Sequence, residues 1–313
     1  MTGRRERRGF ALIAVLWVVV VLGVLGVELQ AAGLFSRNAT ANARAATRAR
    51  WAARAGLARA MEMLDRRIAG NLAGFDLAAA GDSALPAMQL DVDGTSVRVV
   101  TLDARARLNL NRAGHHELER LFDAAGLGTR AADSLADAVL DWRDADDLRR
   151  GRGAEGADYR TLRPAARPKD APFDAVEELA TVWGMTAERY RRVAPYLTVA
   201  GDGRVNVNSA SAAVLRTLPE IDEGAAVAIV RRRVRAPIRN IFELLAVVPL
   251  PVRTRMKARM GEMTDRISFF PREIEVVALA TAPGAPVGAE LHGTILLSGA
   301  SNVALVSVTE RLK

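Results

Sequence analysis

The N-terminal stretch MTGRRERRGFALIAVLWVVVVLGVLGVE, residues 1–28, decides how the rest of this sequence is read. Four arginines within residues 4–8 precede an unbroken apolar run at residues 10–27. At ~1.5 Å rise per residue, this run of roughly 18 residues makes a helix of ~27 Å, close to the thickness of a bilayer's hydrocarbon core. Because flanking arginines stay cytoplasmic, we expect a single membrane pass with the N-terminus inside and the bulk of the chain outside.

The residues around Gly9 allow two interpretations. A plain signal anchor that is never cut fits the long apolar run, which continues into helical sequence and lacks the cleavage site of an ordinary secretory signal. The segment RRGFALI, residues 7–13, also resembles the leader of pilins and pseudopilins. In that family a prepilin peptidase cuts after the glycine and methylates the new N-terminus. The resemblance therefore implies cleavage between Gly9 and Phe10.

Ala14 departs from the common pilin pattern. Most pilins carry a glutamate at this fifth mature position, where it compensates the terminal ammonium of a neighbouring subunit inside the membrane. A subunit without the carboxylate cannot offer that pairing, and an unpaired charge in the membrane is costly. Within the family, this absence marks one minor pseudopilin at the filament tip.

The rest of the chain reads as a helix and strands that bracket a helical block. Alanine and arginine favour one long helix over residues 10–68, ending near Gly70. Residues 75–86 look like a loop, and two alternating strands follow around the turn Asp93-Gly94. Further strands are expected at 273–280, 291–297 and 303–312, with a hairpin turn at 298–302. The fold class is α+β: a long N-terminal transmembrane helix packed on an antiparallel pilin-like sheet with a large helical insertion.

An internal repeat lies inside this block. LNLN at 108–111 and VNVN at 205–208 each form a short strand that leads into a helical pattern. Second helices follow at 130–142 and 224–233, and more at 175–183, 187–196, 241–248 and 252–263. We expect residues 112–266 to be all-helical.

The second repeat resembles a helix-hairpin-helix module, and many such modules bind DNA through backbone N–H groups that approach a phosphate. The hairpin here, PEIDEG at 219–224, carries three carboxylates that would repel a phosphate. The arginines at 231–233 end a helix, where its dipole favours cations in any case. The pattern favours protein packing and no nucleic acid; a membrane-anchored DNA-binding or uptake protein is the alternative.

Candidate metal ligands gather in one loop: Asp141, Asp144, Asp146, Asp147, Glu155 and Asp158. Hard oxygen ligands suit calcium, although the EF-hand spacing is absent. The alternative is a solvated acidic loop paired with nearby arginines. The GxGxxG at 151–156 follows no strand, so it does not predict dinucleotide binding. The sequence HHE at 115–117 lacks the HExxH spacing, and we expect exposed polar residues that open a helix.

Composition limits the remaining functions. The chain has no cysteine, which excludes disulfides and thiolate metal sites. Its net charge of +8 is spread along the chain, as on a solvated arginine-rich surface. We find no catalytic constellation and expect no enzyme; a membrane-tethered hydrolase would need a catalytic group that we cannot locate.

The whole chain resembles the type II secretion system protein K family of minor pseudopilins. The motifs that carry the resemblance are, in order, 108–111 (LNLN), 141–144 (DWRD), 153–155 (GAE) with Tyr159, 172–173 (PF), 177–179 (EEL), 184–185 (GM), 196–199 (YLTV) and 205–208 (VNVN). The resemblance implies a bacterial inner-membrane protein with a periplasmic bulk. Its implied partners are the minor pseudopilins I and J, the major pseudopilin and the prepilin peptidase. Its implied role is to initiate or cap a pseudopilus that exports folded proteins across the outer membrane.

The same resemblance divides the chain into five segments. These are a leader at 1–9, the transmembrane part of the helix at 10–27, the pilin-like helix and first strands at 28–111, the helical insertion at 112–266 and the C-terminal strands at 267–313. It also implies calcium in the helical domain, although Gly156 stands where another acid is common in the family.

Overall fold

The computed structural model describes residues 6–70, 87–161, 167–283, 288–297 and 303–312. Side chains are described within these ranges except at 6–14, 29, 31–36, 67–70 and 311–312. The expected loop at 75–86 and the expected hairpin turn at 298–302 lie outside the described residues. The backbone of Gly9, Phe10 and Ala14 is helical, but the side chains of Phe10 and Ala14 lie outside the described part.

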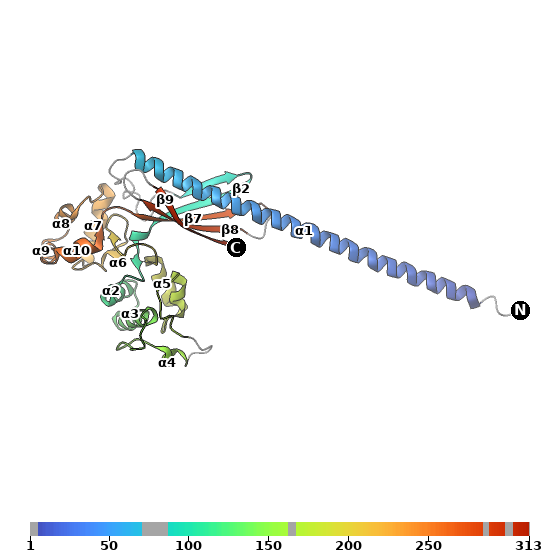
Figure 1. Cartoon of the computed structure of the whole chain (residues 1–313), viewed down its shortest axis with the longest axis horizontal. Helices are drawn as coiled ribbons and strands as arrows, with labels where there is room; N and C mark the ends of the chain where they lie inside the picture. The colour runs from blue at the N-terminus through green and yellow to red at the C-terminus, as the bar shows by residue number, and fades with distance from the viewer. Residues whose placement is uncertain (1–5, 71–86, 162–166, 284–287, 298–302, 313) are drawn as a thin grey trace.

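One long helix and one antiparallel sheet form the first layer pair (Figure 1). The helix α1 spans Glu6–Gly70, so it ends at the glycine expected from the sequence. The sheet has the order β1-β2-β7-β8-β9, and all four strand pairs are antiparallel. Its strands are β1 (Met88–Val92), β2 (Thr95–Asp103), β7 (Glu273–Thr281), β8 (Ala289–Leu297) and β9 (Val303–Leu312).

The turn between β1 and β2 has a local cause. Asp93 and Gly94 both have positive φ, 50° and 75°, which is the backbone of a two-residue turn whose twist matches the two strands. The amide of Gly94 donates a hydrogen bond to Asp91 Oδ1 at 3.0 Å. The Asp-Gly hairpin expected from the sequence is confirmed.

The second half of α1 packs on the sheet through small side chains. Ala49, Ala52, Ala53, Leu57, Ala60 and Leu64 are all buried and form one core with the inward residues of β2, β7 and β8. Gly56 sets the distance between α1 and β2, because a Cβ there would lie 2.9 Å from methyl carbons of both Val97 and Val99. Gly293 on β8 admits Leu57 in the same way, with a Cβ-to-Cδ1 distance of 2.8 Å. A stripe of small residues therefore lets the helix lie close to the sheet.

The first half of α1 extends beyond the sheet (Figure 1). From Val15 to Val27 its large apolar side chains have exposed fractions from 48 % to 67 %. Among the residues whose side chains are described, no helical stretch has the length and apolar character needed to cross a membrane.

The helical block lies between β2 and β7, at the end of the sheet away from the N-terminus (Figure 1). Its first unit contains η2 (Ala104–Ala106), β3 (Leu108–Asn109), α2 (His115–Ala124), α3 (Thr129–Arg143), α4 (Gly156–Tyr159), η3 (Val176–Thr181), α5 (Ala187–Val193), η4 (Ala194–Tyr196) and β4 (Leu197–Thr198). Its second unit contains β5 (Val205–Asn206), α6 (Ala212–Leu215), α7 (Glu223–Arg235), α8 (Ile241–Val247), α9 (Leu250–Ala258), α10 (Met260–Arg266) and β6 (Ile267–Ser268). Both units share one apolar core, distinct from the core under α1.

The expectation of an all-helical insertion was wrong in one respect. Each unit is closed by a two-residue parallel ladder, β3 with β4 and β5 with β6. The strand at each Asn-x-Asn motif thus pairs with a strand at the end of its unit, and a helical periodicity cannot reveal this pairing. The helix expected at 175–183 is also shorter and tighter, a 3-10 helix at Val176–Thr181. The boundaries of the five segments that the sequence resemblance implies, from the leader to the C-terminal strands, remain predictions.

The two units repeat the same contacts. In the first, Asn109 Oδ1 accepts from the amide of Asn111 at 2.8 Å; in the second, Asn206 Oδ1 accepts from the amide of Asn208 at 3.0 Å. An arginine near the end of the second helix of each unit then donates to backbone carbonyls of the Asn-x-Asn turn. Arg143 does so to Leu110 and Ala113, and Arg233 to Val207 and Ala210. The internal repeat read from the sequence is confirmed by these matched contacts.

Candidate functional site

A buried polar network fixes the helical block to the sheet. Asp103, the last residue of β2, accepts hydrogen bonds from Asn206 Nδ2 at 2.7 Å, Ser209 Oγ at 2.6 Å and the amide of Arg105 at 2.9 Å. Burial raises the pKa of this carboxyl, and the three donors act in the opposite direction. Asp103 is 2 % exposed, so the second unit is held against the sheet by bonds that water does not weaken.

Arg105 extends the network to the end of the block. Its guanidinium binds both carboxylate oxygens of Asp202, at 3.2 and 2.6 Å, and donates to Ser268 Oγ at 2.7 Å. Two-point binding of a carboxylate by arginine fixes orientation as well as charge. Neither Asp103 nor Arg105 is recognisable from the sequence, since a single acid at a strand end carries no distinctive signal.

The six acids expected to bind calcium divide into two groups. Asp141, at the end of α3, and Glu155, which precedes α4, are buried, and Asp144 is half-buried. Asp146 and Asp147 are exposed in the connecting loop, and Asp158 lies on α4, within 3.5 Å of Arg149. The structure therefore brings Asp141, Asp144 and Glu155 inward, and Asp158 is half-buried as well.

Arg150 neutralises two of the inward acids. Its Nη1 lies 2.8 Å from Asp141 Oδ1 and also hydrogen-bonds Asp144 Oδ2, while its backbone amide donates to Asp141. Gly153 leaves the space for this carboxylate, because a Cβ there would lie 1.9 Å from Asp141 Oδ2. The glycines of the GxGxxG at 151–156 thus include one with a packing role.

Glu155, unlike Asp141 and Asp144, is not paired with Arg150. Neither of its carboxylate oxygens, nor Asp144 Oδ1, receives a hydrogen bond from the described residues, although all three atoms are buried. Burial, followed by the charges of Asp141 and Asp144, raises the pKa of Glu155 to about 7. Buried carboxylate oxygens without donors fit the hard ligand chemistry of calcium.

A second set of candidate metal ligands lies at the start of α2. Within the described residues, only His115, His116 and Glu119 bring three potential metal-ligating atoms within 4.8 Å of one another. The sequence predicts that both histidines are exposed polar residues. That holds for His116, whose side chain is 90 % exposed, but His115 is only 30 % exposed. The signal that was available is the i, i+1, i+4 spacing at a helix start.

The acidic hairpin of the second unit is occupied by ion pairs. Glu220 has a positive φ of 62°, and its carboxylate lies 2.9 Å from Arg255 Nε and 3.0 Å from Arg259 Nη1. These arginines of α9 and the residue after it lower the pKa of Glu220. Asp222 caps α7 by accepting from the amide of Ala225 at 2.9 Å. Two of the three carboxylates that were expected to repel a phosphate, Glu220 and Asp222, are here structural elements of the hairpin.

Two of the three arginines at 231–233, which argued for DNA binding, hydrogen-bond backbone carbonyls of this chain. Arg232 donates to the carbonyl of Ala236, and Arg233 donates to those of Val207 and Ala210. The alternative of DNA binding therefore gains no support from the contacts of this hairpin.

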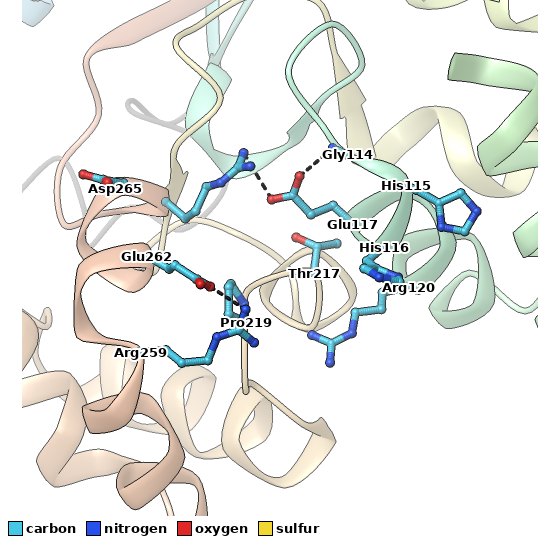
Figure 2. Close-up of a pocket in the computed structure, with 11 residues that line it drawn as sticks. Gly114, His115, His116, Glu117, Arg120, Thr217, Pro219, Arg259, Glu262 and Asp265 are labelled. Atoms are coloured by element: carbon cyan, nitrogen blue, oxygen red, sulfur yellow. Dashed lines mark hydrogen bonds and ion pairs between the residues drawn. The ribbon is translucent and has the colours of Figure 1, made fainter. Parts of the chain in front are cut away.

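An open cleft of about 590 Å³ separates the start of α2 from the second unit (Figure 2). Glu117 spans it: one carboxylate oxygen accepts from the amide of Gly114 at 2.7 Å, and the other lies 3.3 Å from Arg266 Nη1. Arg259 pairs with Glu262 at 2.5 Å on the side of the cleft formed by the second unit, one helical turn apart at the start of α10. The cleft is lined by charged groups, and the pair Glu117–Arg266 crosses the junction of the two units.

Comparison with known proteins shows the family. Models of the family described as type II secretion system (T2SS), protein K match residues 99–202 and 205–260. The type II secretion system protein K of Pseudomonas aeruginosa is 32 % identical over 287 residues, covering 85 % of this chain and 81 % of that protein. This chain belongs to the type II secretion system protein K family. The boundary between the two matched regions falls where the first unit ends with β4 and the second begins with β5.

More distant members of the family align as well. The type II secretion system protein K of Pectobacterium carotovorum subsp. carotovorum is 26 % identical over 236 residues, covering 70 % of this chain and 69 % of that protein. Among solved structures, the fold matches a chain from the crystal structure of the GspK-GspI-GspJ complex of the enterotoxigenic Escherichia coli type 2 secretion system. The TM-score is 0.59 at 14 % identity, with 85 % of this chain and 99 % of that chain covered. At this identity the likeness establishes a shared mixed fold of helices and antiparallel sheet.

Proposed function

We propose that this chain is the minor pseudopilin K of a type II secretion system and works by assembly, without a catalytic role. Membership of the protein K family is the observation that carries the proposal. The fold supports it, because a long helix lies on an antiparallel sheet that holds a two-unit helical block. The solved neighbour is a complex with GspI and GspJ, so the minor pseudopilins I and J are the proposed partners.

The proposed anchor is the apolar run at 10–27, with the N-terminus in the cytoplasm and the bulk in the periplasm. Large apolar side chains from Val15 to Val27 are exposed on α1. Leaving such side chains in water costs on the order of 1.5–3 kcal/mol each relative to burying them, so a lipid or helical partner is favoured. The arginines within residues 4–8 fix the direction of insertion. We further propose that the prepilin peptidase cuts between Gly9 and Phe10.

Ala14 supports a place at the filament tip. A pseudopilin with a glutamate there neutralises the terminal ammonium of the subunit above it. Because Ala14 offers no carboxylate, a subunit placed above this chain would keep an uncompensated charge in the apolar bundle. The most favourable place is therefore the top of the filament, where the chain initiates or caps assembly with I and J.

Calcium is proposed as a structural ion of the first unit. Glu155 and Asp144 supply three buried oxygens without hydrogen-bond donors, and Asp141 supplies a third carboxylate beside them. When bound, calcium would supply the positive charge that Glu155 lacks, since Asp141 and Asp144 are already paired with Arg150. The exposed Asp146 and Asp147 are left out of the proposed ligand set, and Asp158 is paired with Arg149.

The test uses the full chain expressed in cells with a working secretion system and purified from inner membranes. We expect mass spectrometry to find an N-terminus at methylated Phe10 and to find I and J among the co-purified proteins. A Gly9→Leu variant serves as the control, because the peptidase should leave its leader attached and secretion should fall. Met1 retained in secretion-competent cells, or undisturbed secretion after deletion of the chain, would contradict the proposal.

A further inference from the structure

The start of α2 brings two imidazoles and a carboxylate together, with one potential ligand atom from each side chain within 4.8 Å of the others; the two histidines are shown in Figure 2. His115 and His116 open the helix, and Glu119 follows at the position where a side chain lies over the same turn. His116 Nδ1 lies 3.6 Å from Glu119 Oε2. Two ligands at roughly 2.1 Å from one tetrahedral zinc ion lie about 3.4 Å apart, so this pair is already near the required spacing.

The other side of His115 is oriented by carboxylates. Its Nε2 lies 3.2 Å from Asp133 Oδ1 and 3.2 Å from Asp137 Oδ1, both on α3. Carboxylates only accept hydrogen bonds, so Nε2 carries a proton and the ring nitrogen left for a metal ion is Nδ1. A metal-ligating histidine commonly donates its second ring N–H to a carboxylate in this way, which fixes the tautomer and raises the basicity of the ligand.

Arg152 holds those carboxylates in place. Its Nη1 lies 2.5 Å from Asp133 Oδ2, and its backbone amide donates to Asp137 Oδ2 at 3.0 Å. Each aspartate thus has one oxygen on Arg152 and the other on His115. The orienting shell is therefore built into the packing of α2 against α3 and the loop after it.

Two positive charges oppose a cation here, that of the helix N-terminus and that of the Arg152 guanidinium on Asp133. The N-terminus of a helix carries a partial positive charge that disfavours a cation by about 0.3–1 kcal/mol. The carboxylates of Glu119, Asp133 and Asp137 face the same region and offset this charge. Coordinate bonds from two imidazoles and a carboxylate are much stronger than the residual repulsion, so the ligand set determines whether a cation binds.

We propose that His115, His116 and Glu119 form a surface site for a divalent transition-metal ion of the zinc class, with Asp133 and Asp137 as positioning residues. Imidazole nitrogen selects such ions over calcium, so this site is chemically distinct from the acidic loop. Three protein ligands leave a coordination position open to water. The site links α2 to α3 and stabilises the first unit in proportion to the ion's occupancy.

The test is zinc titration of the full chain in detergent, purified without a histidine tag and with calcium in excess to saturate oxygen sites. We expect one zinc ion, with affinity at least about tenfold weaker in His116→Asn and in Glu119→Gln and abolished in the His115→Asn, His116→Asn pair. Asp137→Asn should weaken binding by about tenfold, as loss of an orienting partner does. The matched control is His292→Asn, which changes the remaining histidine and should leave affinity unchanged.

Copper(II) in place of zinc gives a second measurement, because its electron paramagnetic resonance spectrum reports bound nitrogen. Coupling to two imidazole nitrogens, reduced to one in His116→Asn, is expected. Should the pair variant bind zinc as tightly as the native chain, or should only His292→Asn lose the ion, the site assigned here would be wrong. His116 is so exposed that its substitution leaves the fold intact, which circular dichroism checks.

Discussion

Asn208 and Ile238 hold each other through two hydrogen bonds of 2.8 Å, one from Asn208 Nδ2 to the carbonyl of Ile238 and one from the amide of Ile238 to Asn208 Oδ1. Asn111 and Phe173 make the same two-way contact in the first unit, at 2.9 and 2.8 Å. In each unit a side-chain amide takes the place of a strand partner and closes a distant loop onto the Asn-x-Asn turn. The asparagines of the repeat are thus structural residues.

Replacing Asn208 by alanine should destabilise the chain by about 2–4 kcal/mol, because the buried amide and carbonyl of Ile238 lose their partners. Denaturant unfolding of the full chain in detergent, followed by circular dichroism, measures the loss. Asn111→Ala is the matched comparison, and its loss should be smaller because Asn111 is only half-buried. Equal, small losses in both variants would show that these hydrogen bonds do not hold the loops.

Gly56→Val should weaken the docking of α1 on the sheet, because the first added carbon meets Val97 and Val99 at 2.9 Å. Overpacking of this kind costs about 1–3 kcal/mol. We expect lower stability of the full chain, with a matching fall in secretion. Gly261→Val in α10 is the control, since a Cβ there meets nothing within 4 Å. If the two substitutions have the same effect, the loss reflects helix propensity and not close packing.

Glu155 should make stability depend on pH in buffer containing a chelator. Burial raises its pKa to about 7, above the ordinary value of 4.5. Its contribution is therefore fully present below about pH 4.5 and is lost as the pH rises to about 7, with a maximum loss of about 3 kcal/mol. Glu155→Gln should remove this component, so the variant should be more stable than the native chain at pH 8 and similar at pH 4.5. A constant difference across this range would contradict the prediction.

Calcium should restore, at neutral pH, the stability that is lost through the buried carboxylate of Glu155. Adding calcium at pH 7.5 should raise the melting temperature of the native chain, because the ion binds only the folded arrangement of Asp144 and Glu155. The increase should be lost in Glu155→Gln and reduced in Asp144→Asn. Asp147→Asn, which removes an exposed acid of the same loop, should keep it. An equal response from all four proteins would exclude this ligand set.

Local sequence predicted most of the elements correctly. The Asp93-Gly94 turn, the alternation in β7 and the helical composition of α1 depend on neighbours along the chain, so they are legible without a structure. The two Asn-x-Asn turns were also visible, since a repeated motif is a property of the sequence. The polar contacts that give those asparagines their role were not.

The sequence by itself determined the long apolar-to-helical N-terminus, the strands that bracket the helical block and the family. Only the tertiary structure decided that β2 pairs with β7 across the whole insertion, that Asp103 meets Asn206, and that Arg150 lies between Asp141 and Asp144. It also brought the histidines of α2 against the aspartates of α3. Propensity and periodicity act between near neighbours, whereas these contacts arise when burial brings together side chains that are distant in the sequence.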